Sequence, residues 1–330
     1  MTGIRPRTRE PAMTDPTQPM RVTMLRRMTP DILAVTLAPA EGAAPAPPPA
    51  GAHVDLHIPH PQGPLVRQYS LTGPPGHRPY ELAVLREAHS RGGSAFLHDR
   101  LAVGDVLAVG PPRNRFPACE TAAHSILIAG GIGIAPIWSL AQRLTQCGRP
   151  WELHYAARGA AQAAFLPALL AQAHGRVTTC FRADGQPRLA LSRLASACAA
   201  DTHVYCCGPA RMMTDFEAAF AHLPAAQRHR EHFTPVAPPA TEQGFELVLA
   251  RSRRTLQVPP GRTILETVRG AGISAPFSCQ EGVCGKCETR VIEGIADHRD
   301  SVLSPAEHAR GDTMMICCSG AKSGRLVLDL

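Results

Sequence analysis

Several cysteines near the end of the chain stand at a spacing that can hold iron. The pattern is C-x4-C-x2-C, formed by Cys279, Cys284 and Cys287. A fourth candidate, Cys317 or Cys318, follows about thirty residues later. A [2Fe–2S] cluster needs four thiolates on two irons, and these gaps let one loop wrap it. Zinc, a disulfide and chance are the alternatives, but structural zinc sites usually carry two short C-x2-C pairs.

Two short motifs in the first third of the chain can bind a phosphate and a flat ring. They are Arg67-Gln68-Tyr69-Ser70 and Gly92-Gly93-Ser94. An arginine offers a fork of donors to phosphate, and a tyrosine can lie along a ring with its hydroxyl free to bond. The Gly-Gly-Ser turn offers backbone N–H groups and a hydroxyl. Each alone could be a surface charge or a plain turn. Together they resemble the flavin-binding barrel of the ferredoxin–NADP reductase family, which is marked by R-x-Y-S.

A glycine-rich turn follows a buried strand expected at 125–129. It runs Gly130-Gly131-Ile132-Gly133-Ile134-Ala135-Pro136 and leads into a helix, where a pyrophosphate can approach the helix N-terminus. Pro136 stands at the last position of G-x-G-x-x-G, so the Rossmann fingerprint is weak. The turn resembles the G-G-x-G-x-x-P of the same reductase family, and Cys207-Gly208-Pro209 resembles its C-G-P, which lies near the nicotinamide. A buried strand-end thiol is the alternative for Cys207.

The resemblance implies a set of cofactor contacts. The flavin residues that it implies are Arg67, Gln68, Tyr69, Ser70, Val84, Leu85, Gly92, Gly93, Ser94, Ala135 and Phe233. The NADH-site residues are Gly131, Gly133, Cys207, Gly208 and Pro209, and the cluster ligands are Cys279, Cys284, Cys287 and Cys317. For Phe233, a strand-end side chain packed in the core is the alternative. No nucleophile or acid–base catalyst is needed, and none is expected.

The elements that must position these motifs form three domains. Short strands with turn signals predict an antiparallel barrel, and alternating strands and helices predict a parallel sheet covered by helices. The last part follows the order of a β-grasp, plant-type ferredoxin. The expected boundaries are 1–20 for a disordered tail, 21–117 for the flavin barrel, 118–236 for the NAD-binding domain, 237–244 for a linker and 245–330 for the ferredoxin domain.

Individual elements are expected at defined positions. Strands are predicted at 32–37, 54–58, 80–85, 106–109, 152–156, 177–181 and 203–207. A helix is predicted at 210–223, and the ferredoxin part should have a hairpin over 245–258 and a short helix at 263–270. Arg158 comes just after the strand at 152–156, where an arginine could contact a 2′-phosphate.

Barrel, nucleotide domain and C-terminal ferredoxin in this order resemble the phthalate dioxygenase reductase family, which includes vanillate O-demethylase reductase components. The match covers about residues 21–330, and Asp297-His298-Arg299-Asp300 is close to that group. The resemblance implies FMN, NADH and electron delivery to a separate Rieske-type aromatic oxygenase. Flavin fits between NADH, a two-electron donor, and a one-electron cluster. Two residues depart from the family: Ala135, where Thr is frequent, and Gly320, where Arg is frequent.

Composition limits the other classes. The net charge is +7, but the arginines are scattered and aromatics are scarce, so no nucleic-acid partner is expected. The sequence contains no run of 18 apolar residues, so no membrane span is expected, and the N-terminus has no apolar signal region. With eleven cysteines, this favours a reducing, cytoplasmic location. The alternatives are the same electron chain serving another oxygenase, such as one for a quaternary amine, a free-standing diaphorase, and an iron–sulfur redox sensor.

Overall fold

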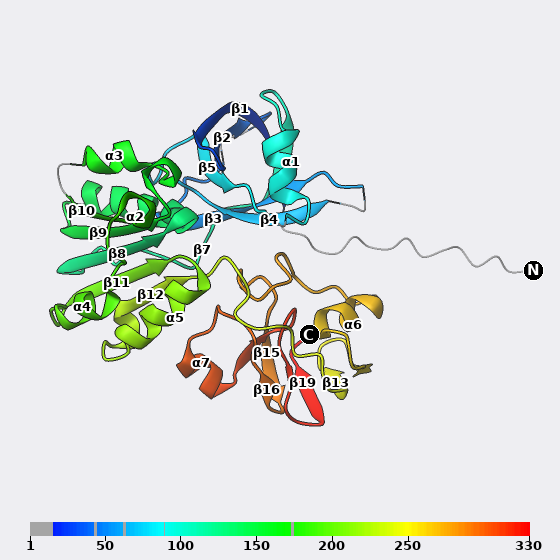
Figure 1. Cartoon of the computed structure of the whole chain (residues 1–330). Helices are drawn as coiled ribbons and strands as arrows, with labels where there is room; N and C mark the ends of the chain where they lie inside the picture. Colours follow the sequence, from blue (N-terminus) through cyan, green and yellow to red (C-terminus); the bar gives the residue numbers. More distant parts are fainter. Residues whose placement is uncertain (1–15, 43–44, 62–63, 89, 173–174) are drawn as a thin grey trace, which may run out of the picture. The chain divides into compact units, whose positions relative to one another are not determined.

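A computed structural model of the chain describes residues 16–42, 45–61, 64–88, 90–172 and 175–330. It contains two compact units, one from Thr17 to Phe233 and one that includes Thr234 to Leu330 (Figure 1). Within the described residues, no helix is long and apolar enough to cross a membrane. Each unit is described by itself.

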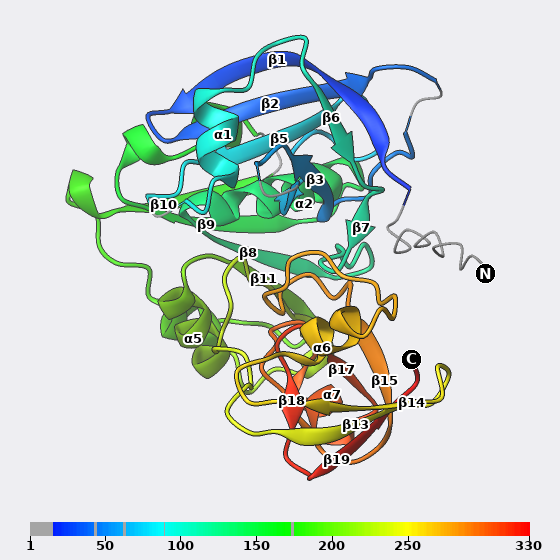
Figure 2. The ribbon, with the colours of Figure 1, turned by 90° about the vertical axis from the view of Figure 1, so that its right-hand side faces the viewer.

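The first unit opens with the antiparallel barrel that the strand spacing predicts. Its strands are β1 (Gln18–Thr29), β2 (Ile32–Pro39), β3 (Ala52–Ile58), β4 (Leu65–Ser70), β5 (Tyr80–Leu85), β6 (Val106–Val109) and β7 (Arg113–Asn114). The order is β4-β3-β6-β1-β2-β5, with β7 beside β3. A bridge between Leu71 and Leu82 joins the segment after β4 to β5 and closes the barrel. Helix α1 (Gly93–Asp99) contacts β5 (Figure 2).

The barrel begins earlier than the sequence predicts. Strand β1 starts at Gln18, and Met20, which was assigned to the tail, is buried and pairs with both β2 and β6. The sequence gives only a weak signal for this strand, because buried apolar residues alternate with exposed polar and charged ones. The strand also directly follows the polar N-terminal segment. Residues 1–15 of the predicted tail lie outside the described residues.

The second part of this unit is the predicted parallel sheet, which has five strands in the order β10-β9-β8-β11-β12. The strand β12 was not among the predicted ones. Its strands are β8 (His124–Gly130), β9 (Trp151–Ala157), β10 (Gly175–Phe181), β11 (Thr202–Cys207) and β12 (Arg228–Glu231). The helices are α2 (Ile134–Gln146), α3 (Leu166–Leu170), α4 (Leu191–Ser196) and α5 (Ala210–Ala219). Helix α5 ends at Ala219, before the predicted residue 223, and Pro224 disfavours helical geometry only at Leu223.

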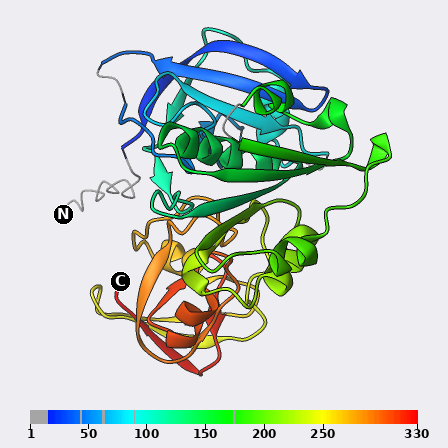
Figure 3. The ribbon, with the colours of Figure 1, turned by 90° about the vertical axis from the view of Figure 1, so that its left-hand side faces the viewer.

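Side chains alternate across this sheet and form a core on each face. Leu127, Tyr155 and Tyr205 pack with α2, whereas Ile128 and Cys206 pack with α4 and α5. The two layers of helices on opposite faces are visible in the green part of Figure 3. All strands run parallel, so their carboxyl ends, including Gly130 and Cys207, meet at one edge.

The second unit has the mixed sheet expected of a β-grasp fold, in the order β14-β13-β19-β15-β17 (Figure 2). Its elements are β13 (Phe245–Leu249), β14 (Arg254–Val258), α6 (Ile264–Gly270), β15 (Glu288–Glu293), β16 (Ala296–Asp297), α7 (Pro305–Arg310), β17 (Thr313–Met315), β18 (Gly320–Ala321) and β19 (Arg325–Leu328). Strands β13 and β19 are parallel, and the other pairs are antiparallel. Thr263 and Glu266 form a capping box that starts α6.

Candidate functional site

The structure brings the two phosphate-type motifs of the barrel together. Arg67 lies on β4, and Gly93 starts α1. A Cβ added to Gly93 would lie 3.1 Å from Cγ of Arg67, so a larger residue would crowd the arginine. Gly92 has φ 98°, a backbone conformation that favours glycine. The guanidinium and the start of α1 therefore form one cradle with donors from both elements.

Both motifs also carry hydroxyl groups. Ser94 is buried, and its Oγ accepts a hydrogen bond from the backbone N–H of Glu87 at 3.1 Å. Ser70 Oγ is buried and has no hydrogen-bond partner among the described residues, which is a costly state unless a ligand supplies one. Burial raises the pKa of the Tyr69 phenol above its ordinary value, so the hydroxyl stays protonated. The cradle therefore fits a flavin phosphate and ring.

Three of the predicted flavin residues have other contacts. Gln68 Nε2 donates to Asp55 Oδ1 at 2.6 Å, across the β3–β4 pair. The side chain of Val84 is buried in the barrel core, and its carbonyl lies 2.8 Å from His98 Nε2. Leu85 is half-buried and packs against the core that includes α2. At these three residues, a ligand could therefore contact backbone atoms more readily than side chains.

The two dinucleotide motifs are in direct contact. A Cβ added to Gly133 would lie 2.1 Å from the carbonyl oxygen of Cys207, so only glycine allows this approach. A Cβ on Gly208 would lie 3.2 Å from Cα of Gly130. Gly131 has φ 55° and open space where a Cβ would be. The glycine turn therefore packs tightly on the β11 side and leaves room on the other side.

That room is part of a pocket of about 640 Å³ at the carboxyl edge of the parallel sheet. Gly130, Gly131 and Pro209 line it, and four arginines do so as well: Arg158, Arg182, Arg188 and Arg211. Positive charge beside a glycine turn suits a pyrophosphate or another phosphate. Two of the predicted NADH-site residues, Gly131 and Pro209, therefore line a cavity of a size and charge that suit a dinucleotide, whereas Gly133, Cys207 and Gly208 do not line it.

A buried polar cluster connects the flavin motif with the Cys-Gly-Pro motif, and the sequence did not reveal it. His53 on β3 lies opposite Ser70, and its Nδ1 is 3.8 Å from Glu231 Oε1. Glu231 lies opposite Cys207 in the β11–β12 pair. Burial raises the pKa of Glu231 to about 8 and lowers that of His53 to about 4. Both groups are neutral at pH 7, so this contact is not an ion pair.

Arg113 and Asp55 lie next to this cluster, since Arg113 is opposite His53 in the β3–β7 pair. Arg113 on β7 forms two hydrogen bonds with Asp55, at 2.7 and 2.8 Å, and Asp55 also accepts from Gln68. Burial raises the pKa of the Cys207 thiol well above its ordinary value, and the neighbouring Glu231 adds to the shift. The only sequence signal was the segment 229–233 at the end of the domain, which contains Glu231 but gives no hint of His53.

The two remaining predicted residues of this unit differ in exposure. Ala135 is buried near the start of α2. Phe233 is 40% exposed and follows β12, so it is not packed in the domain core. An exposed aromatic ring at this strand end is compatible with a ligand contact.

In the second unit, the four predicted cysteines converge. The thiol of Cys279 lies beside those of Cys284 and Cys317, and the thiol of Cys287 lies beside that of Cys317. These contacts raise the pKa of Cys284, through Cys279, and that of Cys287, through Cys317. All four are buried. Four thiols from one loop and one later segment are the donor set of a [2Fe–2S] cluster, so these residues fit that group.

The loop geometry explains the glycines in the motif. Gly282 has φ 71° and Gly285 has φ 72°, and Gln280 is also left-handed, with φ 61°. The backbone N–H of Glu281 donates to Sγ of Cys279 at 3.3 Å. Backbone N–H groups that donate hydrogen bonds to the sulfur atoms commonly surround an iron–sulfur cluster.

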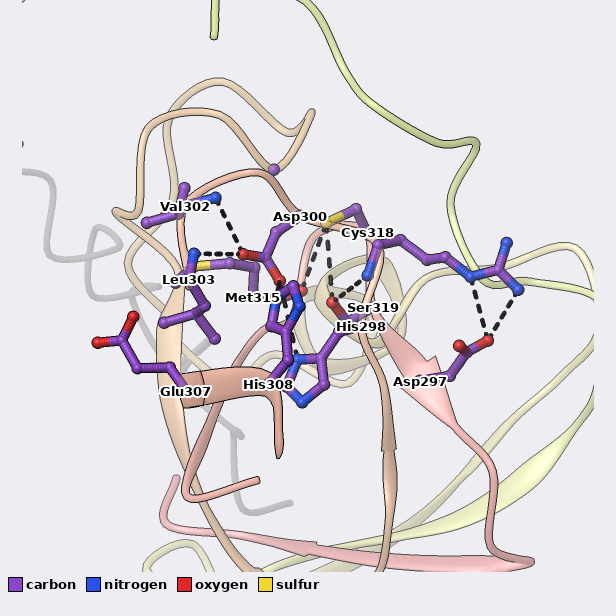
Figure 4. A network of polar contacts seen from close by, with 12 residues as sticks. Asp297, His298, Asp300, Val302, Leu303, Glu307, His308, Met315, Cys318 and Ser319 are labelled. Carbon is purple, nitrogen blue, oxygen red and sulfur yellow. Dashed lines mark hydrogen bonds and ion pairs between the residues drawn. The ribbon is translucent and has the colours of Figure 1, made fainter. Parts of the chain in front are cut away.

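Cys318 points elsewhere. Its Sγ lies 3.8 Å from the carbonyl of Met315 and 3.9 Å from Oγ of Ser319 (Figure 4). A Cβ on Gly282 would lie 2.5 Å from this sulfur, so Cys318 fills the space behind the loop. The structure thus groups Cys317, and not Cys318, with the other three thiols.

Comparisons with known proteins agree with this arrangement. A family model described as "2Fe-2S iron-sulfur cluster binding domain" matches residues 247–322. The chain is 49% identical over 304 residues to phenoxybenzoate dioxygenase subunit beta of Ectopseudomonas oleovorans, covering 91% of this chain and 93% of that protein. The solved structure of phthalate dioxygenase reductase, described as a modular structure for electron transfer from pyridine nucleotides to [2Fe-2S], aligns with a TM-score of 0.69 and 34% identity over 95% of this chain and 98% of that chain.

The chain belongs to the phthalate dioxygenase reductase family. It is an oxidoreductase of that family, with the flavin-type barrel, nucleotide-binding parallel sheet and [2Fe–2S] domain in the predicted order. A second solved structure, an intact type IV self-sufficient cytochrome P450 monooxygenase, aligns with a TM-score of 0.85 and 38% identity over 95% of this chain. This chain spans 41% of that protein.

The flavin assignment in this family member can be tested at the cradle. We expect Arg67→Ala and Ser94→Ala each to weaken flavin retention, because each would remove a donor of the predicted phosphate site. The loss of one charged hydrogen bond should weaken flavin binding at least about tenfold. Flavin content and affinity are measured after gel filtration, with iron content as the internal control. Full flavin and unchanged affinity in both variants would refute the assignment.

Proposed function

We propose that this chain is the reductase component of a two-component aromatic oxygenase system, and that it takes electrons from NADH through FMN and a [2Fe–2S] cluster to a separate Rieske-type oxygenase. The observation that carries the proposal is the convergence of four buried thiols in a chain whose other unit holds a glycine-lined, arginine-rich pocket. The relative from Ectopseudomonas oleovorans is named as a dioxygenase subunit, which supports an aromatic oxygenase as acceptor.

The residues divide the work by cofactor. When bound, a flavin takes two electrons from NADH as a hydride and gives them up one at a time, as an iron–sulfur cluster requires. Arg67 and Ser94 would hold its phosphate, and Tyr69 would lie along the ring. Gly131 would leave room for the pyrophosphate of NADH, and Gly133 would let the turn pack against Cys207. Cys207 and Glu231, both neutral at pH 7, would border the nicotinamide without adding charge.

Three measurements on the purified holoprotein test the proposal. Chromatography of the released flavin distinguishes FMN from FAD. EPR of the NADH-reduced protein should show a reduced [2Fe–2S] signal. NADH oxidation should then couple to product formation when the Rieske oxygenase encoded nearest to this gene is added. Rapid NADH oxidation that no oxygenase couples to product would contradict the role as an oxygenase component.

The choice of dinucleotide depends on Arg158 and can be measured directly. Family membership favours NADH, but Arg158 lines the pocket after β9, where it would meet a 2′-phosphate. We expect a higher kcat/KM with NADH than with NADPH. Arg158→Ala should lower kcat/KM for NADPH at least about tenfold and change that for NADH little, because only NADPH offers the extra charged hydrogen bond.

The exposed Arg193 on α4, which does not line the pocket, provides the matched control. Arg193→Ala also removes one positive charge, and it should leave kcat/KM unchanged for both NADH and NADPH. A wild-type preference for NADPH would overturn the NADH proposal. Equal losses with both nucleotides in Arg158→Ala would instead show that the arginine does not contact the 2′-position.

A second acceptor class has a specific observation in its favour. The structure with the TM-score of 0.85 is a cytochrome P450 monooxygenase that is described as self-sufficient. The same electron path could therefore serve a separate cytochrome P450. Offering the reduced protein both a Rieske oxygenase and a P450 and comparing the rates of reduction distinguishes these acceptors.

A further inference from the structure

Two histidines and an aspartate gather in the second unit, between β16 and α7. His298 and Asp300 follow β16, and His308 lies on α7 (Figure 4). His308 Nε2 is 3.2 Å from Asp300 Oδ1, and His298 Nδ1 is 3.8 Å from the same oxygen. One nitrogen from each ring and the carboxylate oxygen all lie within 4.8 Å of one another. The proposed electron path uses none of these residues.

The backbone fixes the carboxylate of Asp300 in place. Its Oδ2 accepts hydrogen bonds from the N–H groups of Val302 and Leu303, at 3.0 and 2.8 Å. The side chain is fully buried. With Oδ2 held in this way, Oδ1 is turned toward both histidines. The aspartate is thus a rigid, pre-oriented oxygen donor.

His298 stacks on His308, with ring centroids 4.3 Å apart and ring planes 18° from parallel, so one ring must rotate before both can face one ion. Stacking leaves the ring nitrogens of His298 unexplained. Its side chain is only 9% exposed, and neither ring nitrogen has a hydrogen-bond partner among the described residues. An unsatisfied buried nitrogen costs roughly 1–3 kcal/mol. A neutral imidazole with an open lone pair is a ligand for a metal ion.

We propose that His298, Asp300 and His308 bind one divalent transition-metal ion, for which zinc is the natural probe. Two imidazoles and one carboxylate are a common donor set for zinc and similar ions. Tetrahedral zinc with bonds of about 2.0–2.1 Å separates its ligand atoms by about 3.3 Å. The two histidine–aspartate distances, 3.2 and 3.8 Å, are close to that value. His308 is 29% exposed, so solvent can reach the site and supply the fourth ligand.

The site also adjoins the cysteine loop. Ser301, next to Asp300, donates through its N–H to the carbonyl of Gly282 at 3.0 Å. A Cβ on Gly282 would lie 3.2 Å from Cβ of Asp300. An ion that ties Asp300 to α7 would therefore stiffen the segment that supports the loop between Cys279 and Cys284. The ion has a structural role, distinct from the redox metal of the cluster.

The test uses untagged holoprotein, so that iron occupies the cysteines and no purification tag competes. Zinc is titrated by calorimetry, and Co²⁺ is titrated in parallel by absorption spectroscopy. We expect about one zinc per chain and tetrahedral Co²⁺ bands. His298→Gln and His308→Gln should each weaken zinc binding by at least about 10–100-fold, since even supporting residues of metal sites have effects of that size.

His222→Gln is the matched control, because His222 is an exposed histidine of the first unit. It should bind zinc as the wild type does. The cluster spectrum and circular dichroism show whether each variant is folded. If the variant of the buried His298 does not fold, the variant of the partly exposed His308 still tests the site. Absence of zinc binding in the wild type, equal binding in all variants, or zinc uptake that matches loss of cluster iron would each overturn the proposal.

Discussion

Cys317→Ser should lose or badly perturb the [2Fe–2S] cluster, whereas Cys318→Ser should keep it. The Cys317 thiol lies beside those of Cys279 and Cys287, but the Cys318 sulfur faces Met315, Ser319 and the back of Gly282. The sequence alone favours an extended segment, but residues 316–318 form a turn, in which the N–H groups of Cys318 and Ser319 donate to the Met315 carbonyl. In this turn the two thiols have different neighbours, so only one of them lies with the other three cysteines. The measurements are iron, sulfide and the EPR signal of the reduced protein.

The same substitution at adjacent positions makes the two variants controls for each other. Wild type and Cys318→Ser should contain about two irons per chain, and Cys317→Ser should contain much less or show an altered EPR signal. The opposite pattern would assign Cys318 as the ligand. An intact, unaltered cluster in both variants would mean that the segment can shift to offer either thiol.

Local patterns predicted most of the elements, since each motif stands next to the strand or turn that holds it. The cysteine loop is one example: its spacing and glycines already contain the geometry of the donor set. The strand–turn–helix around Gly131 is another, because periodicity and glycine positions are local properties. The contact between Gly133 and Cys207 follows from parallel strands that end at one edge.

What the sequence did not reveal is held together by contacts between distant segments. His53 and Glu231 meet only because β3 and β12 pack together. Three of the four pocket arginines, Arg182, Arg188 and Arg211, come from separate loops and helices, and only Arg158 had a signal. Short helices such as α1, α4 and α7 have too few residues for a clear period, and they form because tertiary packing favours them.

A chain that ends at Val236 should still oxidise NADH with ferricyanide but should fail to reduce cytochrome c or an oxygenase. The first unit ends at Phe233, after its last strand β12, so this cut removes no strand of the barrel or the parallel sheet. The expected linker at 237–244 attaches to the other unit: Ala240 N–H donates to the Cys318 carbonyl, and Gly261 N–H donates to that of Thr241, both at 2.8 Å. We therefore propose that the units are separable just after residue 233.

Ferricyanide accepts electrons directly from a flavin site, whereas the other acceptors should need the cysteine-bound cluster. Full-length Cys317→Ser provides the matched control, because it keeps both units while its cluster should be lost or impaired. It should show the same pattern of acceptors as the truncated chain. A folded, flavin-loaded truncated chain with no NADH oxidation would contradict the modular division. Undiminished reduction of cytochrome c by that chain would show that electrons leave from the first unit, and would remove the four cysteines from the proposed path.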